Sequence, residues 1–432
     1  MNASDLLLEQ WSQQVKELFP NLHRYQQETL AFVVQGIIQS GNAVMQRVAE
    51  SAWEYLSSEV KIISHERRFQ RFVDNERIEV DTCWSHFLQQ ILSYWDHKPM
   101  TLILDLTPYT DESTIVYVGL LVQSRVLPLG WQVMPQQEQW EQGQWELVRQ
   151  LFDQIASHLS GPSCTLLADR GLTCLTLIKL CKQFGWHYVL RIKNEEWFRK
   201  QFRHFYRDWQ QGKQMVKKEG EQWYGKVLLW QEHSLEIWLS ACWEEGYEEA
   251  WFLISDLCAS IKRVREYAKR MKVESTFQDQ KSRGCLIECS RFTNRDHLHR
   301  WLFGLSGDVV VRTFGRKLSA SWTSRASRSQ RSTRQRTLTH WPFMAQSHSQ
   351  AGQSRSCSQD PRSDQGATDS LPALFASKPS PVFLYLPVLI ILLSRTKFLS
   401  GREPRSGGKC PTKYLRLRAK AAPSCCLPSS SR

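Results

Sequence analysis

The feature that most restricts the fold of this chain is a change of hydrophobic period near residue 100. Apolar runs of strand length and longer stretches of helical period alternate from there on. In chain order they predict three strands, a helix, a strand, a helix and a strand, at residues 101–107, 115–122, 126–134, 144–158, 163–171, 172–184 and 186–192. This order is typical of an α/β protein in which helices flank a mixed sheet.

The residues before this pattern, 1–95, predict a small helical domain. Helical stretches run from residue 4 to about residue 60, and a further one covers residues 63–73. On this last stretch three cations alternate with apolar residues that can pack, and the cations are Arg67, Arg68 and Arg71. A basic helix in a small helical module suits DNA contact, but an ordinary surface helix fits the pattern equally well.

The residues after the pattern predict three further parts. Residues 193–249 are rich in Trp, Tyr, Glu and Lys and contain strand-like pieces, so we expect a β-rich insertion. Its aromatic residues fit an internal core better than stacking on an extruded base. Residues 250–305 resume the core that 96–192 began, and Ser- and Arg-rich residues 306–432 predict a disordered tail.

Two aspartates lie where the predicted strands end. Asp105 is in the second half of the apolar run 101–107, and Asp169 closes the strand before a glycine turn. Either acid alone fits a turn or a helix cap. Apolar residues surround Asp105, however, so an unpaired charge there would be costly, and this favours a functional role for Asp105.

A third acid lies on a stretch whose residue types predict an uninterrupted helix from residue 267 to residue 281. At about 100° per residue, Tyr267, Arg270, Glu274 and Lys281 share one stripe about 60° wide. Such a stripe can present a metal-binding carboxylate flanked by phosphate-binding groups. Taken alone, it is more typical of a solvated helix face with ion pairs one turn apart.

The spacing of these four residues resembles the signature of the DDE transposases of bacterial insertion sequences, in the subgroup known by the letters YREK. The two upstream aspartates on strands agree with that family, and the resemblance covers about residues 20–305. It implies a ribonuclease-H-like core with a β-rich insertion and an N-terminal region that helps to bind terminal repeats. Thr107 is retained, whereas Leu106 stands where many relatives have Gly.

The resemblance also implies the chemistry. Two Mg²⁺ or Mn²⁺ ions would be held by carboxylates, which suit hard cations, and would serve cleavage of a phosphodiester by water and joining of the 3′-ends. The catalytic and metal-holding residues would be Asp105, Asp169 and Glu274. The contacts to DNA phosphates would be Tyr267, Arg270 and Lys281. The partners would be double-stranded transposon ends and target DNA, with a homodimer in the synaptic complex.

The net charge of +13 comes from the tail and gives no support to DNA binding by the body. Residues 312–432 hold 21 of the 56 basic residues and four of the 43 acids, a balance of +17, so residues 1–311 carry 35 − 39 = −4. Any DNA contact of the body must therefore come from local patches. The apolar run 382–393 is too short to cross a bilayer, which takes about 20 residues, so no membrane partner is expected. The scattered cysteines, in a chain without a secretory signal, predict a reducing cytosol. The resemblance implies that this is the bacterial cytoplasm, where a transposase would be associated with the nucleoid.

The resembling proteins continue after the core with apolar helices, which also support dimer contacts. Trp301–Leu305 starts such a helix, and the tail then replaces the rest. We interpret this as a shift of reading frame near residues 304–312. Two alternatives stay open on the sequence. One is a truncated, inactive remnant that only binds DNA, and the other is a different ribonuclease-H-like nuclease.

Overall fold

The computed structural model describes residues 3–56, 60–92, 98–122, 125–136, 142–159, 163–202, 205–283, 285–307 and 309. Within these ranges no helix is long and apolar enough to cross a membrane. The sequence predicts a disordered tail, a shifted reading frame and an apolar run, 382–393, that is too short to cross a membrane. All but the first few residues of that tail lie outside the described part of the chain.

Five helices form the N-terminal part, in chain order α1 (Ala3–Leu18), α2 (Arg24–Ser40), α3 (Met45–Leu56), α4 (Ile62–Asp74) and α5 (Val80–Leu92). The first four are those that the sequence predicts, and α5 is an addition. Helix α2 ends at Gly41, which adopts the left-handed conformation at φ 60° and donates its N–H to the carbonyl of Ile37. On α4 the apolar side chains Phe69, Phe72 and Val73 are buried.

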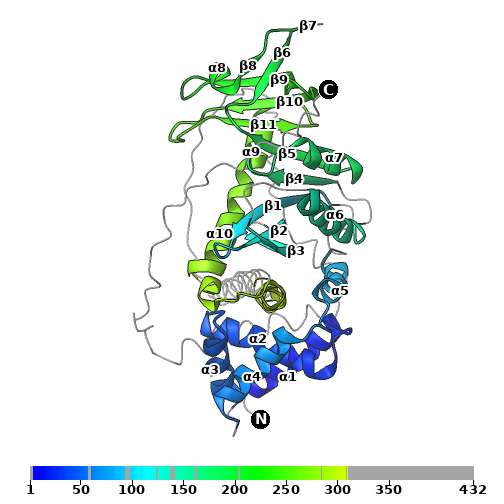
Figure 1. Cartoon of the computed structure of the whole chain (residues 1–432), viewed down its shortest axis with the longest axis vertical. Helices are drawn as coiled ribbons and strands as arrows, with labels where there is room; N and C mark the ends of the chain where they lie inside the picture. The colour runs from blue at the N-terminus through cyan, green and yellow to red at the C-terminus, as the bar shows by residue number, and fades with distance from the viewer. Residues whose placement is uncertain are drawn as a thin grey trace, which may run out of the picture.

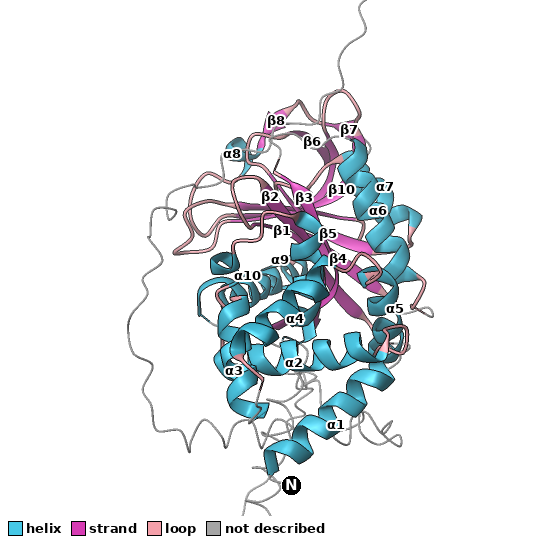
Figure 2. Cartoon of the chain, turned by 60° about the horizontal axis from the view of Figure 1, so that its bottom comes forward, coloured by secondary structure: helices cyan, strands magenta, loops and turns pink. Residues whose placement is uncertain are grey.

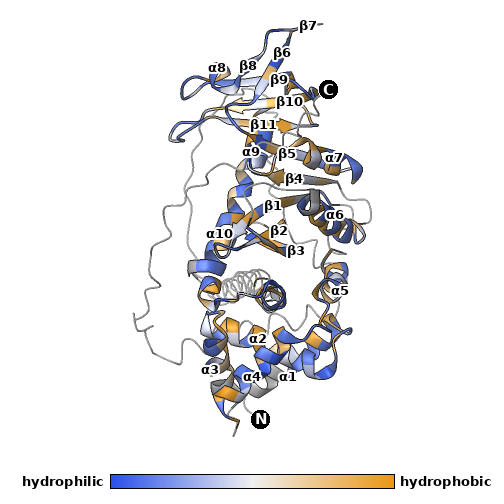
Figure 3. Ribbon diagram, viewed as in Figure 1, coloured by the Kyte–Doolittle hydropathy of each residue, from blue (hydrophilic) through white to orange (hydrophobic). Residues whose placement is uncertain are grey.

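The core follows the predicted order, as β1 (Met100–Pro108), β2 (Ser113–Val122), β3 (Arg125–Pro135), α6 (Gln142–Ala156), β4 (Cys164–Ala168), α7 (Leu175–Gln183) and β5 (His187–Ile192). Strands β1, β2 and β3 form an antiparallel meander, and β4 and β5 are parallel to β1. Helices cover both faces of the sheet, so its strands are buried on both sides and appear in the sequence as continuous apolar runs. Figure 3 shows this as hydrophobic colouring along the strands. The expected α/β fold with a mixed sheet is confirmed.

The predicted insertion extends the same sheet. Its elements are β6 (Trp197–Phe202), β7 (Phe205–Tyr206), β8 (Gln210–Gln211), α8 (Gly212–Met215), β9 (Gln222–Leu229) and β10 (Leu235–Cys242), followed by β11 (Trp251–Ser255). The strand order is β3-β2-β1-β4-β5-β11-β10-β9-β6-β7, with β8 beside β6 (Figure 1). Strand β11 therefore joins the core to the insertion, because it pairs with β5 on one side and β10 on the other.

The helix predicted over residues 267–281 is not continuous. It consists of α9 (Ile261–Ala268), the 3₁₀ turn η2 (Lys269–Met271), α10 (Lys272–Gln278) and the π-helical turn η3 (Asp279–Arg283), and a second 3₁₀ turn η4 (Ile287–Ser290) follows. Such interruptions within helices are frequent at functional hinges. Figures 1 and 2 show α9 and α10 on one face of the sheet and α6 and α7 on the other.

A further helix, residues 295–307, returns to the N-terminal helices. The indole Nε1 of Trp301 donates to the carbonyl of Ala43 at 2.8 Å, and Arg300 Nη1 donates to the carbonyl of Val73 at 2.8 Å. A Cβ at Gly304 would lie 2.6 Å from Val33, so only glycine allows this close approach to α2. The helix that the sequence starts at Trp301 is therefore present, and it begins earlier than predicted.

Candidate active site

The first two acids meet because their strands are parallel neighbours. Strand β1 pairs with β4 up to Leu104 and Ala168, so Asp105 and Asp169 are the next residues along the two strands, at the same edge of the sheet. The carboxyl ends of adjacent parallel strands are where side chains converge in open α/β sheets. Sixty-four positions apart in the chain, the two aspartates thus become neighbours through the register of β1 and β4.

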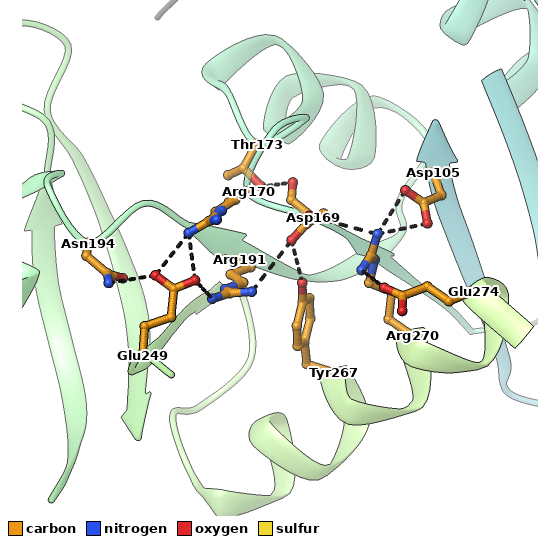
Figure 4. A network of polar contacts seen from close by, with 10 residues as sticks. All are labelled: Asp105, Asp169, Arg170, Thr173, Arg191, Asn194, Glu249, Tyr267, Arg270 and Glu274. Atoms are coloured by element: carbon orange, nitrogen blue, oxygen red, sulfur yellow. Dashed lines mark hydrogen bonds and ion pairs between the residues drawn. The ribbon is translucent and has the colours of Figure 1, made fainter. Parts of the chain in front are cut away.

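The third acid approaches from the helical segment that crosses this edge (Figure 4). Arg270, on the 3₁₀ turn η2, lies between the carboxylates. Its Nη2 lies 2.9 and 2.8 Å from the two carboxylate oxygens of Asp105 and 3.9 Å from Oδ2 of Asp169, and its Nη1 lies 3.3 Å from Oε1 of Glu274. One guanidinium therefore contacts all three acids that the sequence selects.

Asp105 is the most deeply buried of the three. Its side chain is 9% exposed, and its Oδ1 also accepts the backbone N–H of Leu106 at 2.9 Å. Burial raises the pKa of Asp105 above its ordinary value, and the neighbouring guanidinium of Arg270 opposes that rise without cancelling it. Ionisation of Asp105 is thus less favourable than in water. Such shifted pKa values are common for groups that act on a ligand.

Asp169 lies in a more polar setting. The hydroxyl of Tyr267 donates to its Oδ1 at 3.0 Å, and Arg191 Nη1 lies 4.0 Å from the same oxygen. Burial alone would raise the pKa of Asp169, but Arg270, the backbone N–H of Arg170, Arg191 and Tyr267 together hold it below its ordinary value. The surroundings therefore shift the pKa values of the two aspartates in opposite directions.

Tyr267 is 1% exposed, and its ring packs edge-on against Trp251 of β11. Burial and the charge of Asp169 raise the pKa of its hydroxyl, so the group stays protonated and acts as a donor to Asp169. The sequence expects this residue to touch DNA phosphates. The structure instead gives its hydroxyl a partner within the site.

Lys281 lies apart from this cluster, on the π-helical turn η3. Its Nζ donates to the carbonyl of Pro108 at the end of β1 and lies 3.0 Å from the carboxylate of Glu288. Tyr267, Arg270 and Glu274 therefore face one site, as the predicted helix stripe requires. Lys281, on the turn η3, has other partners. That lysine still borders the same sheet edge.

A second ionic cluster adjoins Asp169, and the sequence analysis did not identify it. Glu249 accepts from Arg170 Nη1 at 2.7 and 3.0 Å, from Arg191 Nη2 at 2.7 Å and from Asn194 Nδ2 at 3.0 Å. Arg191 is the link to the site, because its other terminal nitrogen faces Asp169 (Figure 4). An arginine inside the apolar strand 186–192 was the one sequence signal of this cluster.

The three arginines of α4 differ in their surroundings. Arg67 and Arg71 are exposed, whereas Arg68 donates to Thr29 at 2.8 Å, pairs with Glu28 at 3.4 Å and lies 4.8 Å from the ring of Phe32. Arg68 thus ties α4 to α2. The other two present their charge to solvent.

The carboxylates suit a hard divalent cation in kind, since all their donors are oxygens. Asp105, Asp169 and Glu274 come from three separate elements and surround one cationic group, which shows that the site favours positive charge. As they stand, however, no group of three or more His, Cys, Asp or Glu side chains in the described ranges is arranged to hold a metal. The guanidinium of Arg270 lies between these acids.

Comparison with known proteins identifies a family that the chain resembles. Residues 120–307 match the family model described as the transposase DDE domain. The matched segment includes Asp169, Tyr267, Arg270 and Glu274 and begins after Asp105. No match was found among curated proteins. The matched domain supports a transposase role and the nuclease-type chemistry that such a role requires.

Proposed function

We propose that this chain is a DNA transposase of an insertion sequence, of the YREK subgroup, that binds terminal repeats, cleaves the DNA ends and joins the 3′-ends to target DNA. The observation that carries the proposal is the convergence of Asp105, Asp169 and Glu274 on one cation at the edge of the sheet. The match to the transposase DDE domain supports it.

In this proposal Asp105, Asp169 and Glu274 hold two Mg²⁺ or Mn²⁺ ions. When bound, the ions supply the Lewis acidity that cleavage of an anionic phosphodiester requires. The protein contributes the orientation of its carboxylates. Tyr267 fixes Asp169 through the hydrogen bond to Oδ1, and the lowered pKa keeps Asp169 ionised at neutral pH. Asp105 is itself buried, at 6% exposure, so little of its carboxylate meets bulk water.

DNA contact is assigned to local cations. Arg67 and Arg71 are exposed on α4, and they would serve the terminal repeats together with the helical domain 1–95. Arg270 and Lys281 would serve phosphates near the cleaved bond, Arg270 through paired N–H donors and Lys281 as a point charge. A homodimer would bring two DNA ends together, and the protein would act in the bacterial cytoplasm at the nucleoid. The division into a core of 96–192 and 250–305 with an insertion of 193–249 belongs to the same proposal.

Cleavage of a supercoiled plasmid that carries the element's ends tests this function. The parent protein should nick the plasmid in Mg²⁺ and bind end DNA in a gel-shift assay. Asp169→Asn should bind the ends within about twofold and lose at least about 100-fold in nicking, which corresponds to about 2.7 kcal/mol of transition-state stabilisation. Asp153→Asn, an exposed substitution on α6, is the matched control and should nick like the parent.

Two results would contradict the proposal in different ways. Equal nicking by Asp169→Asn and the parent would remove Asp169 from the site. End binding by the parent without any nicking would favour the truncated remnant that only binds DNA.

A further inference from the structure

The site already contains a cation, and it is part of the protein. Three carboxylates face the guanidinium of Arg270, and each of its terminal nitrogens is engaged, Nη2 with Asp105 and Nη1 with Glu274. The side chains of Arg270 and Asp105 are each only 9% exposed. In such surroundings a carboxylate cluster needs positive charge to be stable, and Arg270 provides it.

The hydrogen bonds of Arg270 use the same oxygens that a divalent cation would need. Oδ1 of Asp105 accepts both from the backbone N–H of Leu106 and from Arg270, which occupies its two lone pairs. Oδ2 accepts from Arg270 as well. A cation can coordinate Oδ1 only if one of these bonds is released, and at Oδ2 it would lie beside the positively charged guanidinium and be repelled by it. The guanidinium and a metal ion are therefore competitors.

Two features indicate that Arg270 is able to leave. It lies on the 3₁₀ turn η2, where the backbone N–H of Lys272 is shared between the carbonyls of Arg270 and Lys269 instead of forming a regular α-helical bond. Its Nε is buried without a hydrogen-bond partner. The present position therefore satisfies only part of the guanidinium, whereas an external phosphate can accept from Nε and a terminal nitrogen together.

We propose that Arg270 is a built-in counter-ion that excludes divalent cations from Asp105, Asp169 and Glu274 until a DNA phosphate draws the guanidinium away. This proposal rests on the proposed function, because it assigns that phosphate to a bound DNA end. It makes Arg270 a positioning residue with two states. In the first it holds the acids together without metal, and in the second it holds DNA while the acids are open to ions.

Binding of Mn²⁺ to the full chain without DNA tests the exclusion directly. Equilibrium dialysis, or the loss of the free-ion electron paramagnetic resonance signal, gives the dissociation constant. Arg270→Gln should bind Mn²⁺ at least about tenfold more tightly than the parent, because the competing charge-assisted bonds are gone. Arg265→Gln is the matched control. This arginine is exposed on α9, one turn before the site, and its replacement should leave the Mn²⁺ affinity unchanged.

Thermal unfolding provides a second readout on the same proteins. Without metal, Arg270→Gln should unfold at a lower temperature than the parent, since it leaves buried Asp105 without its cation. Saturating Mn²⁺ should raise its unfolding temperature more than that of the parent, because the ion replaces the lost guanidinium. Equal or weaker Mn²⁺ binding by folded Arg270→Gln would overturn the proposal.

A charge-preserving variant serves if Arg270→Gln does not fold. Arg270→Lys keeps a cation but lacks the planar fork of donors. It should bind Mn²⁺ several-fold more tightly than the parent, and an affinity equal to that of the parent would overturn the proposal.

A further experiment measures Mn²⁺ binding in the presence of a short DNA duplex that carries the terminal repeat. The Mn²⁺ that the duplex binds alone is subtracted. The duplex should increase the Mn²⁺ affinity of the parent and have little effect on Arg270→Gln. Arg270→Gln could bind Mn²⁺ more tightly while the parent cleaves no plasmid. That result would support the proposal that Arg270 is a counter-ion and refute the proposal that the protein is a transposase. Plasmid cleavage by the parent, together with equal Mn²⁺ affinities, would refute only the counter-ion.

Discussion

One nitrogen of Arg270, Nη2, lies 2.9 and 2.8 Å from the two carboxylate oxygens of Asp105, and both side chains are almost fully buried. The pair joins the end of β1 to the turn between α9 and α10, 165 positions later in the chain. It is an ion pair in a place where burial is unfavourable for each partner alone. The balance between burial and attraction can be measured through its dependence on pH.

The first prediction concerns Asp105→Asn. Burial raises the pKa of Asp105 in the folded protein. In the unfolded chain an aspartate titrates at about 3.9, so the folded state binds this proton more tightly. The parent therefore loses stability as pH rises from below that value through the folded pKa, and Asn does not titrate. The free energy of unfolding of the variant, minus that of the parent, should increase from pH 4 to pH 7. Urea denaturation at several pH values measures it, and a decrease would show that attraction by Arg270 outweighs burial.

The second prediction concerns Tyr267→Phe, which removes the hydroxyl that donates to Asp169. Because a third of the Asp169 side chain is exposed, the loss should be about 1 kcal/mol of stability, at the low end for a bond to a charged group. Nicking should fall by up to about tenfold, while end binding should stay within about twofold. Tyr247→Phe is the control, since this tyrosine is exposed and its ring packs on the same Trp251. A large loss of end binding with normal nicking would mean that Tyr267 serves DNA and not Asp169.

The third prediction concerns Glu249→Gln, which weakens the anchor of Arg170 and Arg191. The carboxylate is 34% exposed, so the cost in stability should be about 1 kcal/mol. Arg191 would lose its orientation toward Asp169, and nicking should fall several-fold in plasmid assays. Glu248→Gln changes the same charge on a neighbouring exposed residue and should nick normally. Equal effects of the two variants would assign the loss to overall charge and not to the anchor.

The fourth prediction separates the arginines of α4. Replacement of Arg67 and Arg71 together by Gln should weaken binding of end DNA and reduce the slope of log affinity against log salt by about two, since each contact to a phosphate contributes about 0.9. Arg68→Gln should instead lower the unfolding temperature, because that side chain ties α4 to Glu28 and Thr29. Filter binding at several salt concentrations and thermal unfolding measure the two effects. An unchanged salt slope in the double variant would remove α4 from the DNA contact.

Much of the core could be predicted from the sequence, for a physical reason. Strands buried on both faces require continuous apolar runs, so β1 to β5 were visible as such. The meeting of Asp105 and Asp169 was implied by the resemblance, and the parallel pairing of β1 with β4 that brings it about is a finding of the structure.

The details around Arg270 could not be predicted. Local propensities favour an unbroken helix over residues 267–281. The structure has the turns η2 and η3 there, and their side chains Arg270 and Lys281 contact Asp105 and Pro108, which are distant in the sequence. Arg191 was conspicuous in an apolar strand, but its partner Glu249 lies 58 positions away, and no local rule connects them. The helix α5 was missed, and the start of helix 295–307 was placed too late, because the pattern around each was weak.

Strand β11 has a consequence for shortened forms of this protein. All five of its residues are buried, and both of its edges are occupied, one by β5 and one by β10. Excision of the strands β6 to β10 would leave the apolar strand β11 at the edge of the sheet with unpaired backbone groups, a surface on which chains adhere to one another. We therefore expect the inserted strands to protect the core from self-association.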